Sequence, residues 1–156
     1  MHRIIESEGR IIERCTYYSI SISSKQIIDD LLNNFDIQNK KSLTCSISNK
    51  IPHKYLKDFI RGYFDGDGCI SYTTTDTISF LGTEKTVDFI RNYFHETVKV
   101  KLRSKIMPNI TKNGNIYAIF YSGNSAFKCL SHIYNHSNLF LERKYEKYCC
   151  LIEKYE

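Results

Sequence analysis

The stretch from Phe59 to Gly68, Phe-Ile-Arg-Gly-Tyr-Phe-Asp-Gly-Asp-Gly, constrains the fold of this chain more than any other. Its apolar residues recur at helical spacing, and it ends in two aspartates interleaved with glycines. Gly62 and Gly66 each weaken a helix by roughly 1 kcal/mol relative to alanine, which is tolerable where another helix backbone approaches closely. The sequence therefore predicts a helix from Lys54 to about Gly66 that carries a carboxylate at its end. For Gly66 and Gly68, simple termination of the helix is the alternative explanation, and both causes can act together.

After Gly68 the hydrophobic period changes to two, which predicts two strands, 69–75 and 77–81, joined at Asp76. One face of this pair is expected to point inward with Ile70, Tyr72, Ile78 and Phe80. The other face is expected to point outward with Ser71, Thr73, Thr75 and Ser79. Further helices are expected over 84–97, capped by Thr83, over 124–135 and over 139–155.

Residues 98–106 are predicted to form a strand with four cations on one face: Lys99, Lys101, Arg103 and Lys105. Strand geometry places alternate side chains about 7 Å apart, so these like charges repel one another. Lysines often protect the edge of a sheet, and this purely structural role is one explanation of the four cations. A run of four without an acid favours a phosphate-facing surface by about two to one. The partner strand is expected over 117–121, after a turn at Asn113-Gly114.

The first 50 residues are predicted to form a β-hairpin and a helix from Lys25 to Phe35. The hairpin has one strand over 3–6, a Ser-Glu-Gly-Arg turn and a second strand that runs from 11 to 23. Residues 18–24, the helix and residues 39–42 parallel a later series made of 117–123, a helix and 142–145. The later series is preceded by a helix, two strands, a helix and a strand. We therefore interpret residues 1–50 as the rear part of a repeat whose front is missing, and residues 51–156 as a complete unit.

Bulk properties are those of a globular α+β chain: 156 residues, 42% hydrophobic, and a net charge of +5 that permits an anionic partner without requiring one. The six cysteines have no metal-ligand spacing and suit a reducing compartment. No apolar run approaches the roughly 20 residues that span a bilayer. The charged N-terminus is unlike a signal peptide. We expect an intracellular protein of the cytoplasm or nucleoid, or of an organelle matrix, that does not bind a membrane.

The stretch from Ile60 to Gly68 resembles the LAGLIDADG signature of the DOD-type homing endonucleases. The resemblance is carried by its glycines and acids, Gly62, Asp65, Gly66, Asp67 and Gly68. A calcium loop is excluded because no bidentate Glu follows at the spacing that such a loop requires. The resemblance implies an α+β fold in which an αββαββα unit forms a saddle-shaped antiparallel sheet. Residues 51–156 match one complete unit, and residues 1–50 match the second hairpin and final helix of a partial first unit.

The resemblance also implies roles for individual residues. Two signature helices would pack together through Phe59, Gly62 and Gly66. Asp67 would bind a divalent metal with help from the Gly66 carbonyl. Lys144 would lie near the scissile phosphate, and Lys41, next to Lys40, would take the same place in the partial unit. The concave sheet face would lie on DNA through Ser71, Thr73, Thr75, Ser79, Lys99, Lys101, Arg103 and Lys105. Asp65 suits a hydrogen-bonding role at the helix end at least as well as metal binding.

The chemistry agrees with these roles, because Mg²⁺ held by carboxylate and carbonyl oxygens can activate water and neutralise charge on a phosphodiester. The resemblance implies a Mg²⁺-dependent, site-specific endonuclease of double-stranded DNA, acting in intron homing. Family members with one signature work as homodimers, so the partner would be a second copy or a second LAGLIDADG half. The alternatives are a non-cleaving nucleic-acid-binding protein, either an intron RNA maturase or a DNA-binding regulator, and an inactive truncated remnant.

Overall fold

The computed structural model describes residues 11–16, 18–35, 46–72, 74–102, 107–111 and 114–155. The chain divides into two compact units, which we call the N-terminal unit (1–36) and the C-terminal unit (37–156). Both mix helices with antiparallel strands, so the α+β class is confirmed. No helix of the described residues is long and apolar enough to cross a membrane.

The N-terminal unit contains a short hairpin and one helix. Strand β1 (Ile11–Glu13) pairs antiparallel with β2 (Tyr18–Ile20), and α1 (Lys25–Phe35) follows. The helix was predicted within the same bounds. The prediction that residues 11–23 continue as one strand is wrong, because the chain turns between β1 and β2 and the two strands pair with each other. This local pairing closes only a short loop, which keeps its entropic cost small. The other predicted strand, over 3–6, lies outside the described residues.

Helix α1 exposes its apolar face. Its hydrophobic residues recur at helical spacing, but none of its side chains is buried. The large side chains that remain exposed are Ile28, Leu31, Leu32 and Phe35.

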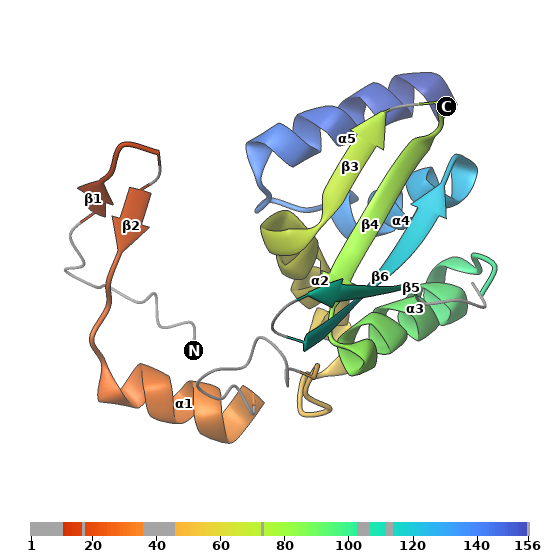
Figure 1. The fold of residues 1–156 in the computed structure, drawn as a ribbon. Helices are drawn as coiled ribbons and strands as arrows, with labels where there is room; N and C mark the ends of the chain where they lie inside the picture. Colours follow the sequence, from red (N-terminus) through yellow and green to blue (C-terminus); the bar gives the residue numbers. More distant parts are fainter. Residues whose placement is uncertain are drawn as a thin grey trace. The chain divides into compact units, whose positions relative to one another are not determined.

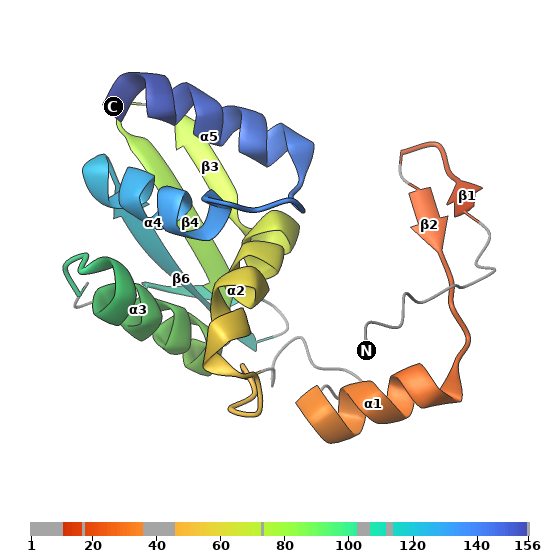
Figure 2. The same ribbon diagram turned by 180° about the vertical axis from the view of Figure 1, so that it is seen from behind.

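The C-terminal unit begins with α2 (His53–Asp67), β3 (Cys69–Tyr72), β4 (Asp76–Gly82) and α3 (Glu84–Val98). It continues with β5 (Met107–Thr111), β6 (Gly114–Ser122), α4 (Asn124–Tyr134) and α5 (Glu142–Tyr155). The strands form an antiparallel sheet in the order β3-β4-β6-β5. The four helices cover one face of this sheet, and Figures 1 and 2 show the unit from both sides.

The core of the C-terminal unit lies between the sheet and the helices. Ile70 pairs with Ile78, and Phe80 pairs with Ile119, so the inward positions of three strands align. Phe64 of α2 packs on Phe80, with ring centroids 5.0 Å apart, and both side chains are fully buried. From α4 come Ala126, Cys129, Leu130, Ile133 and Tyr134. Thr83 caps α3 as predicted, because its Oγ1 accepts the Thr86 N–H at 3.3 Å.

The strand predicted over 98–106 is wrong in its described part. Helix α3 runs to Val98, and Lys99 ends it in the left-handed conformation with φ of 59°. Residues 99–102 form no strand, and β6 pairs instead with β5, which begins at Met107. Val100 is buried beside the helix end, where its carbonyl oxygen lies 2.9 Å from His95 Nδ1. The α3 helix thus continues into the first residue of the alternating pattern.

Two smaller predictions about the first strand pair also need correction. Asp76 is not the joint between the strands, because it is the first residue of β4 and pairs with Tyr72. Tyr72 points toward the helices as predicted, because its hydroxyl donates to the Lys147 carbonyl on α5, but it lies outside the buried core and is 41% exposed. Thr75 lies in the bend before β4 and not in a strand.

The last predicted helix begins at Glu142 and not at 139. Asn113, in the predicted turn, lies outside the described residues.

Candidate functional site at the end of helix α2

Helix α2 is amphipathic and carries the acidic stretch at its C-terminal end. Its inner face buries Leu56, Ile60, Arg61 and Phe64. The helix ends at Gly68, whose N–H donates to the Phe64 carbonyl at 2.8 Å. A Cβ at Gly68 would overlap the Phe64 ring, so the absence of a side chain permits this close approach. Gly68, and not Gly66, is therefore the glycine that helix termination requires.

The outer face of α2 is uncovered within the C-terminal unit. Gly62 and Gly66 are exposed, and a Cβ at either would meet no atom within 4 Å. Tyr55 is 49% exposed, and Phe59 is half-buried. Spaced four, three and four residues apart, these positions form one stripe along the helix, which we call the glycine face (Tyr55, Phe59, Gly62, Gly66).

The two aspartates at the helix end have different environments. Asp65 is fully engaged: Tyr134 Oη donates to its Oδ1 at 2.6 Å, and the Leu141 N–H donates to its Oδ2 at 3.1 Å. Burial, followed by this hydrogen bond and the Asp65 charge, raises the pKa of Tyr134. Asp65 therefore ties α2 to α4 and to the segment before α5, which is the hydrogen-bonding role that the sequence allowed for.

Asp67 is exposed, and its carboxylate has no hydrogen-bond or ion-pair partner among the described residues. It sits at the negative end of the helix dipole, which favours a cation. Carboxylate and carbonyl oxygens are the ligands that Mg²⁺ prefers, so Asp67 and the Gly66 carbonyl fit part of a magnesium shell. No group of three or more His, Cys, Asp or Glu that could hold a metal occurs in the described part of the chain.

Lys144 lies beneath the end of α2 and is only 3% exposed. Its ammonium donates to three backbone carbonyls: to Phe64 O, to Asp65 O at 2.9 Å and to Gly68 O at 2.6 Å. Desolvation, with a smaller effect from Arg143, lowers the pKa of Lys144. An ammonium has three N–H donors, so in this position none remains for a phosphate.

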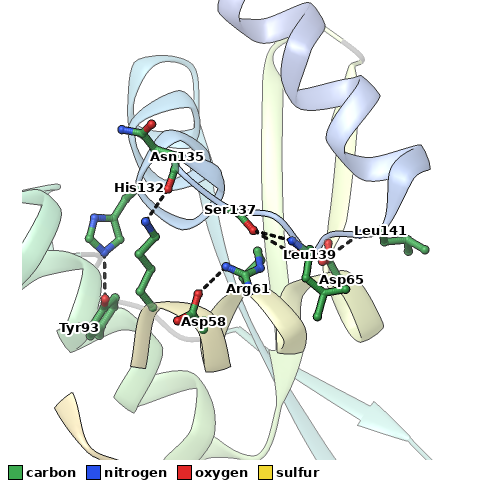
Figure 3. A network of polar contacts seen from close by, with 10 residues as sticks. Asp58, Arg61, Asp65, Tyr93, His132, Asn135, Ser137, Leu139 and Leu141 are labelled. Carbon is green, nitrogen blue, oxygen red and sulfur yellow. Dashed lines mark hydrogen bonds and ion pairs between the residues drawn. The ribbon is translucent and has the colours of Figure 1, made fainter. Parts of the chain in front are cut away.

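One further polar contact joins α2 to the end of α4, and Figure 3 shows it beside an ion pair within α2 and a contact between α3 and α4. Lys57 Nζ donates to the Asn135 carbonyl at 2.5 Å, and so places a cation at the C-terminal end of α4. Arg61 pairs with Asp58 at 2.6 Å. His132 lies 2.9 Å from the Tyr93 hydroxyl, and burial, followed by the Lys57 charge, lowers the pKa of this histidine. The orientation of α2 is therefore fixed by its neighbours in the C-terminal unit.

The sheet face opposite the helices is lined by small hydroxyl side chains. Ser71 and Ser79 alternate with the buried Ile70, Ile78 and Phe80, so they point away from the helices as predicted. The sequence interpretation missed the Thr77–Ser122 pair, whose hydroxyl oxygens lie 3.2 Å apart across β4 and β6. It also missed Phe120, which is 41% exposed opposite Ser79. The same alternation along β4 and β6 could have found all three.

Three other predicted site residues are described, and no strand brings them into this face. Lys99 and Lys101 are exposed in the segment after α3. Thr75 is exposed in the bend before β4. Lys41, Thr73, Arg103 and Lys105 lie outside the described residues. Comparison of the chain with protein-family models and with curated proteins gave no match.

Proposed function

We propose that the chain is a LAGLIDADG-type homing endonuclease or a part of one, which cuts specific sites in double-stranded DNA with Mg²⁺ inside the cell. The observation that carries the proposal is the pairing of two features on one helix. Asp67 is exposed at the end of α2, and its carboxylate has no hydrogen-bond or ion-pair partner among the described residues. The glycine face of the same helix is uncovered within the described part of the C-terminal unit, where no atom lies within 4 Å of a Cβ at Gly62 or Gly66.

A phosphodiester resists hydrolysis because its negative charge repels the attacking oxygen. A bound Mg²⁺ supplies activated water and neutralises charge on the phosphate. Asp67 and the Gly66 carbonyl would hold the ion. Gly68 keeps the backbone close to the Phe64 ring, and Asp65 and Lys144 fix the turn that carries Asp67. A rigid carboxylate at a helix end is the arrangement that such an ion needs.

The second acid of the site would come from another signature helix. Without Cβ atoms at Gly62 and Gly66, a second helix backbone can approach closely, and Tyr55 and Phe59 add apolar area beside the contact. Two helices packed in this way bring their C-terminal acids together. A second copy of the chain or a second LAGLIDADG half would supply the partner.

The hydroxyl-lined face of the sheet suits contact with DNA. Ser71 and Ser79 can donate to phosphates or to base edges, and these contacts would fix the register of the duplex. Lys99 and Lys101 would add phosphate contacts from the segment after α3.

Cleavage tests the proposal directly. Wild-type protein is incubated with Mg²⁺ and a library of randomised duplex targets, beside Asp67→Asn and the control Glu153→Gln, which removes an exposed carboxylate on α5. We expect cleavage by wild type and Glu153→Gln and none by Asp67→Asn. Absence of cleavage by the wild type over a wide range of concentration contradicts the enzyme proposal.

A non-cleaving nucleic-acid-binding protein, such as an intron RNA maturase, is the second candidate. The presence of one signature stretch in the sequence favours it, because a two-metal site needs an acid from each of two such stretches. It predicts an affinity that survives Asp67→Asn and falls for the double variant Lys99→Ala, Lys101→Ala. The slope of log affinity against log salt would flatten by about 0.9 per lysine removed. An unchanged slope contradicts a phosphate contact by either lysine.

A further inference from the structure

The environment of Lys144 differs from that of a cation that faces a ligand. Its ammonium is buried, and three carbonyl oxygens converge on it: Phe64 O, Asp65 O and Gly68 O. Phe64 O also accepts the Gly68 N–H, whereas Asp65 O is one of the last helix carbonyls, which have no partner within a helix, and the Lys144 ammonium satisfies it. A buried charge is tolerated only when its donors are satisfied in this way.

The carbonyls that Lys144 contacts flank, in the sequence, the residues proposed to hold the metal. Gly66 and Asp67 lie in the chain between Asp65 and Gly68, so Lys144 binds the backbone on both sides of them. The titratable groups that act on the ammonium through space are Arg143 on its own helix, Asp65 and Asp67 on α2, and Cys69 just after α2. The Lys144 ammonium therefore contacts the turn itself and not a group outside the turn.

Helix α5 is itself anchored along its length, which fixes where the Lys144 ammonium can lie. Tyr148 and Leu151 are buried in the core. Near the end of the helix, Lys154 Nζ and Tyr155 Oη donate to the Asp76 carboxylate at 2.6 and 2.8 Å. The position of α5 in the core therefore determines where the Lys144 side chain holds the end of α2.

We propose that Lys144 is a positioning residue, which holds the turn from Asp65 to Gly68 so that Asp67 and the Gly66 carbonyl face one metal ion. The connection between Lys144 and the metal rests on the proposed function, but the hydrogen bonds that hold the turn do not depend on it. This role excludes a direct contact between Lys144 and a phosphate.

Lysine acetylation of the folded wild-type protein, read by mass spectrometry, separates the two roles without a mutation. Lys147 lies one turn further along α5 and is exposed; its ammonium lies 3.4 Å from Ile70 O and 5.7 Å from the centroid of the Tyr72 ring. We expect Lys147 to be acetylated while Lys144 is protected, with or without duplex DNA. If Lys144 reacts as readily as Lys147 and is protected only when DNA is added, it faces a phosphate and the proposal is overturned.

Amide hydrogen exchange tests the grip on the turn. In Lys144→Met, which keeps much of the side-chain volume and removes all three donors, we expect the Gly68 amide to exchange roughly 10- to 100-fold faster. This is the effect of losing one hydrogen bond to a charged group. The amides of Ile78 and Phe80 in the central strand serve as internal references. Lys147→Met is the matched control and should leave Gly68 unchanged. Unchanged exchange at Gly68 in a folded Lys144→Met overturns the proposal.

Chemical rescue separates positioning from simple filling of space, and it also serves if Lys144→Met fails to fold. Lys144→Ala lacks the atoms that propylammonium would replace. We expect propylammonium, but not 1-propanol at equal concentration and ionic strength, to restore Gly68 protection. Equal rescue by both compounds, or by neither, contradicts the role of the ammonium.

Binding of Mn²⁺, measured by electron paramagnetic resonance, connects the turn to the metal. Loss of the positive charge of Lys144 would by itself strengthen the binding of Mn²⁺ to Asp67, whereas displacement of Asp67 would weaken it. We expect weaker Mn²⁺ binding by Lys144→Ala and recovery with propylammonium. Stronger or unchanged binding by the variant overturns the connection to the metal. Absence of Mn²⁺ binding by the wild type counts against the proposed function instead, and the exchange and acetylation results still decide the grip on the turn.

Discussion

Helices α1 and α4 share a local design but have opposite surroundings. Each has 11 residues, and each follows the second strand of an antiparallel hairpin. Leucine stands at the seventh position of both, as Leu31 and as Leu130. Leu130 is fully buried, whereas Leu31 is 37% exposed. Helical periodicity therefore specifies the helix and its apolar face, but not whether anything covers that face.

The difference lies in the elements around each helix. Helix α4 packs against α2, α3, α5 and the strands β4 and β6. Within residues 11–16 and 18–35, α1 has only a two-stranded hairpin beside it. An isolated 11-residue helix is marginal in water, and so is a lone hairpin. We therefore expect most of the stability of the chain to come from the C-terminal unit.

The largest expected effect compares the two leucines directly. Leu130→Ala should lower the free energy of unfolding by about 2 to 5 kcal/mol, because it leaves a cavity in the core. Leu31→Ala should change it by no more than about 0.5 kcal/mol. Urea titration followed by circular dichroism measures both values. A comparable loss in Leu31→Ala would show that the apolar face of α1 is covered in solution.

The contrast between covered and uncovered positions recurs within α2. Gly68→Ala should lower the free energy of unfolding by about 1 to 3 kcal/mol, because the new methyl group overlaps the buried Phe64 ring. Thermal unfolding measures this loss. An unchanged melting temperature would mean that the Phe64 ring can move aside.

Gly62 offers the opposite case, since a Cβ there meets only open space. Gly62→Ala should raise the stability of the unpaired chain by up to about 1 kcal/mol through helix propensity. The same substitution should weaken pairing through the glycine face, which analytical ultracentrifugation would detect. A variant that is more stable and pairs as well as the wild type would remove the glycine face from the interface.

Removal of residues 1–36 should have the smallest effect. The fragment 37–156 keeps the whole sheet and its four helices. We expect its melting temperature to lie within about 4 °C of that of the full chain, which corresponds to less than about 1 kcal/mol for a domain of this size. Calorimetry of both proteins makes the comparison. A larger decrease would show that the N-terminal unit stabilises the C-terminal unit.

Much of the fold could be predicted because the hydrophobic periodicity of its helices and strands is a local property of the sequence. The helix α1 and the pairing of β3 with β4 follow directly from spacing. The strand over 98–106 was mispredicted because Val-Lys-Val-Lys alternates as a strand does, while in the structure Val98 ends a helix and Lys99 adopts a left-handed conformation. No local pattern distinguishes these two outcomes.

The candidate site could be predicted only in part. The spacing of acids and glycines placed Asp67 at a helix end, and the structure exposes it there. The acceptors of Lys144 could not be predicted, because its three carbonyl partners lie 76 to 80 residues earlier in the chain. The partners of Asp65, on Tyr134 and Leu141, are equally remote in sequence. Backbone carbonyls leave no signature in a sequence, so such contacts appear only when the chain has folded.

These remote contacts set an order of events during synthesis. The end of α2 is translated long before the residues that hold it, because 79 residues separate Asp65 from Lys144. At 5 to 20 residues per second, a ribosome needs about 4 to 16 s to cover that distance. During this interval the nascent acidic turn lacks its lysine anchor. The arrangement of Asp67 is therefore completed only after α5 has been made, so the chain is translated nearly to residue 155 before its candidate site can form.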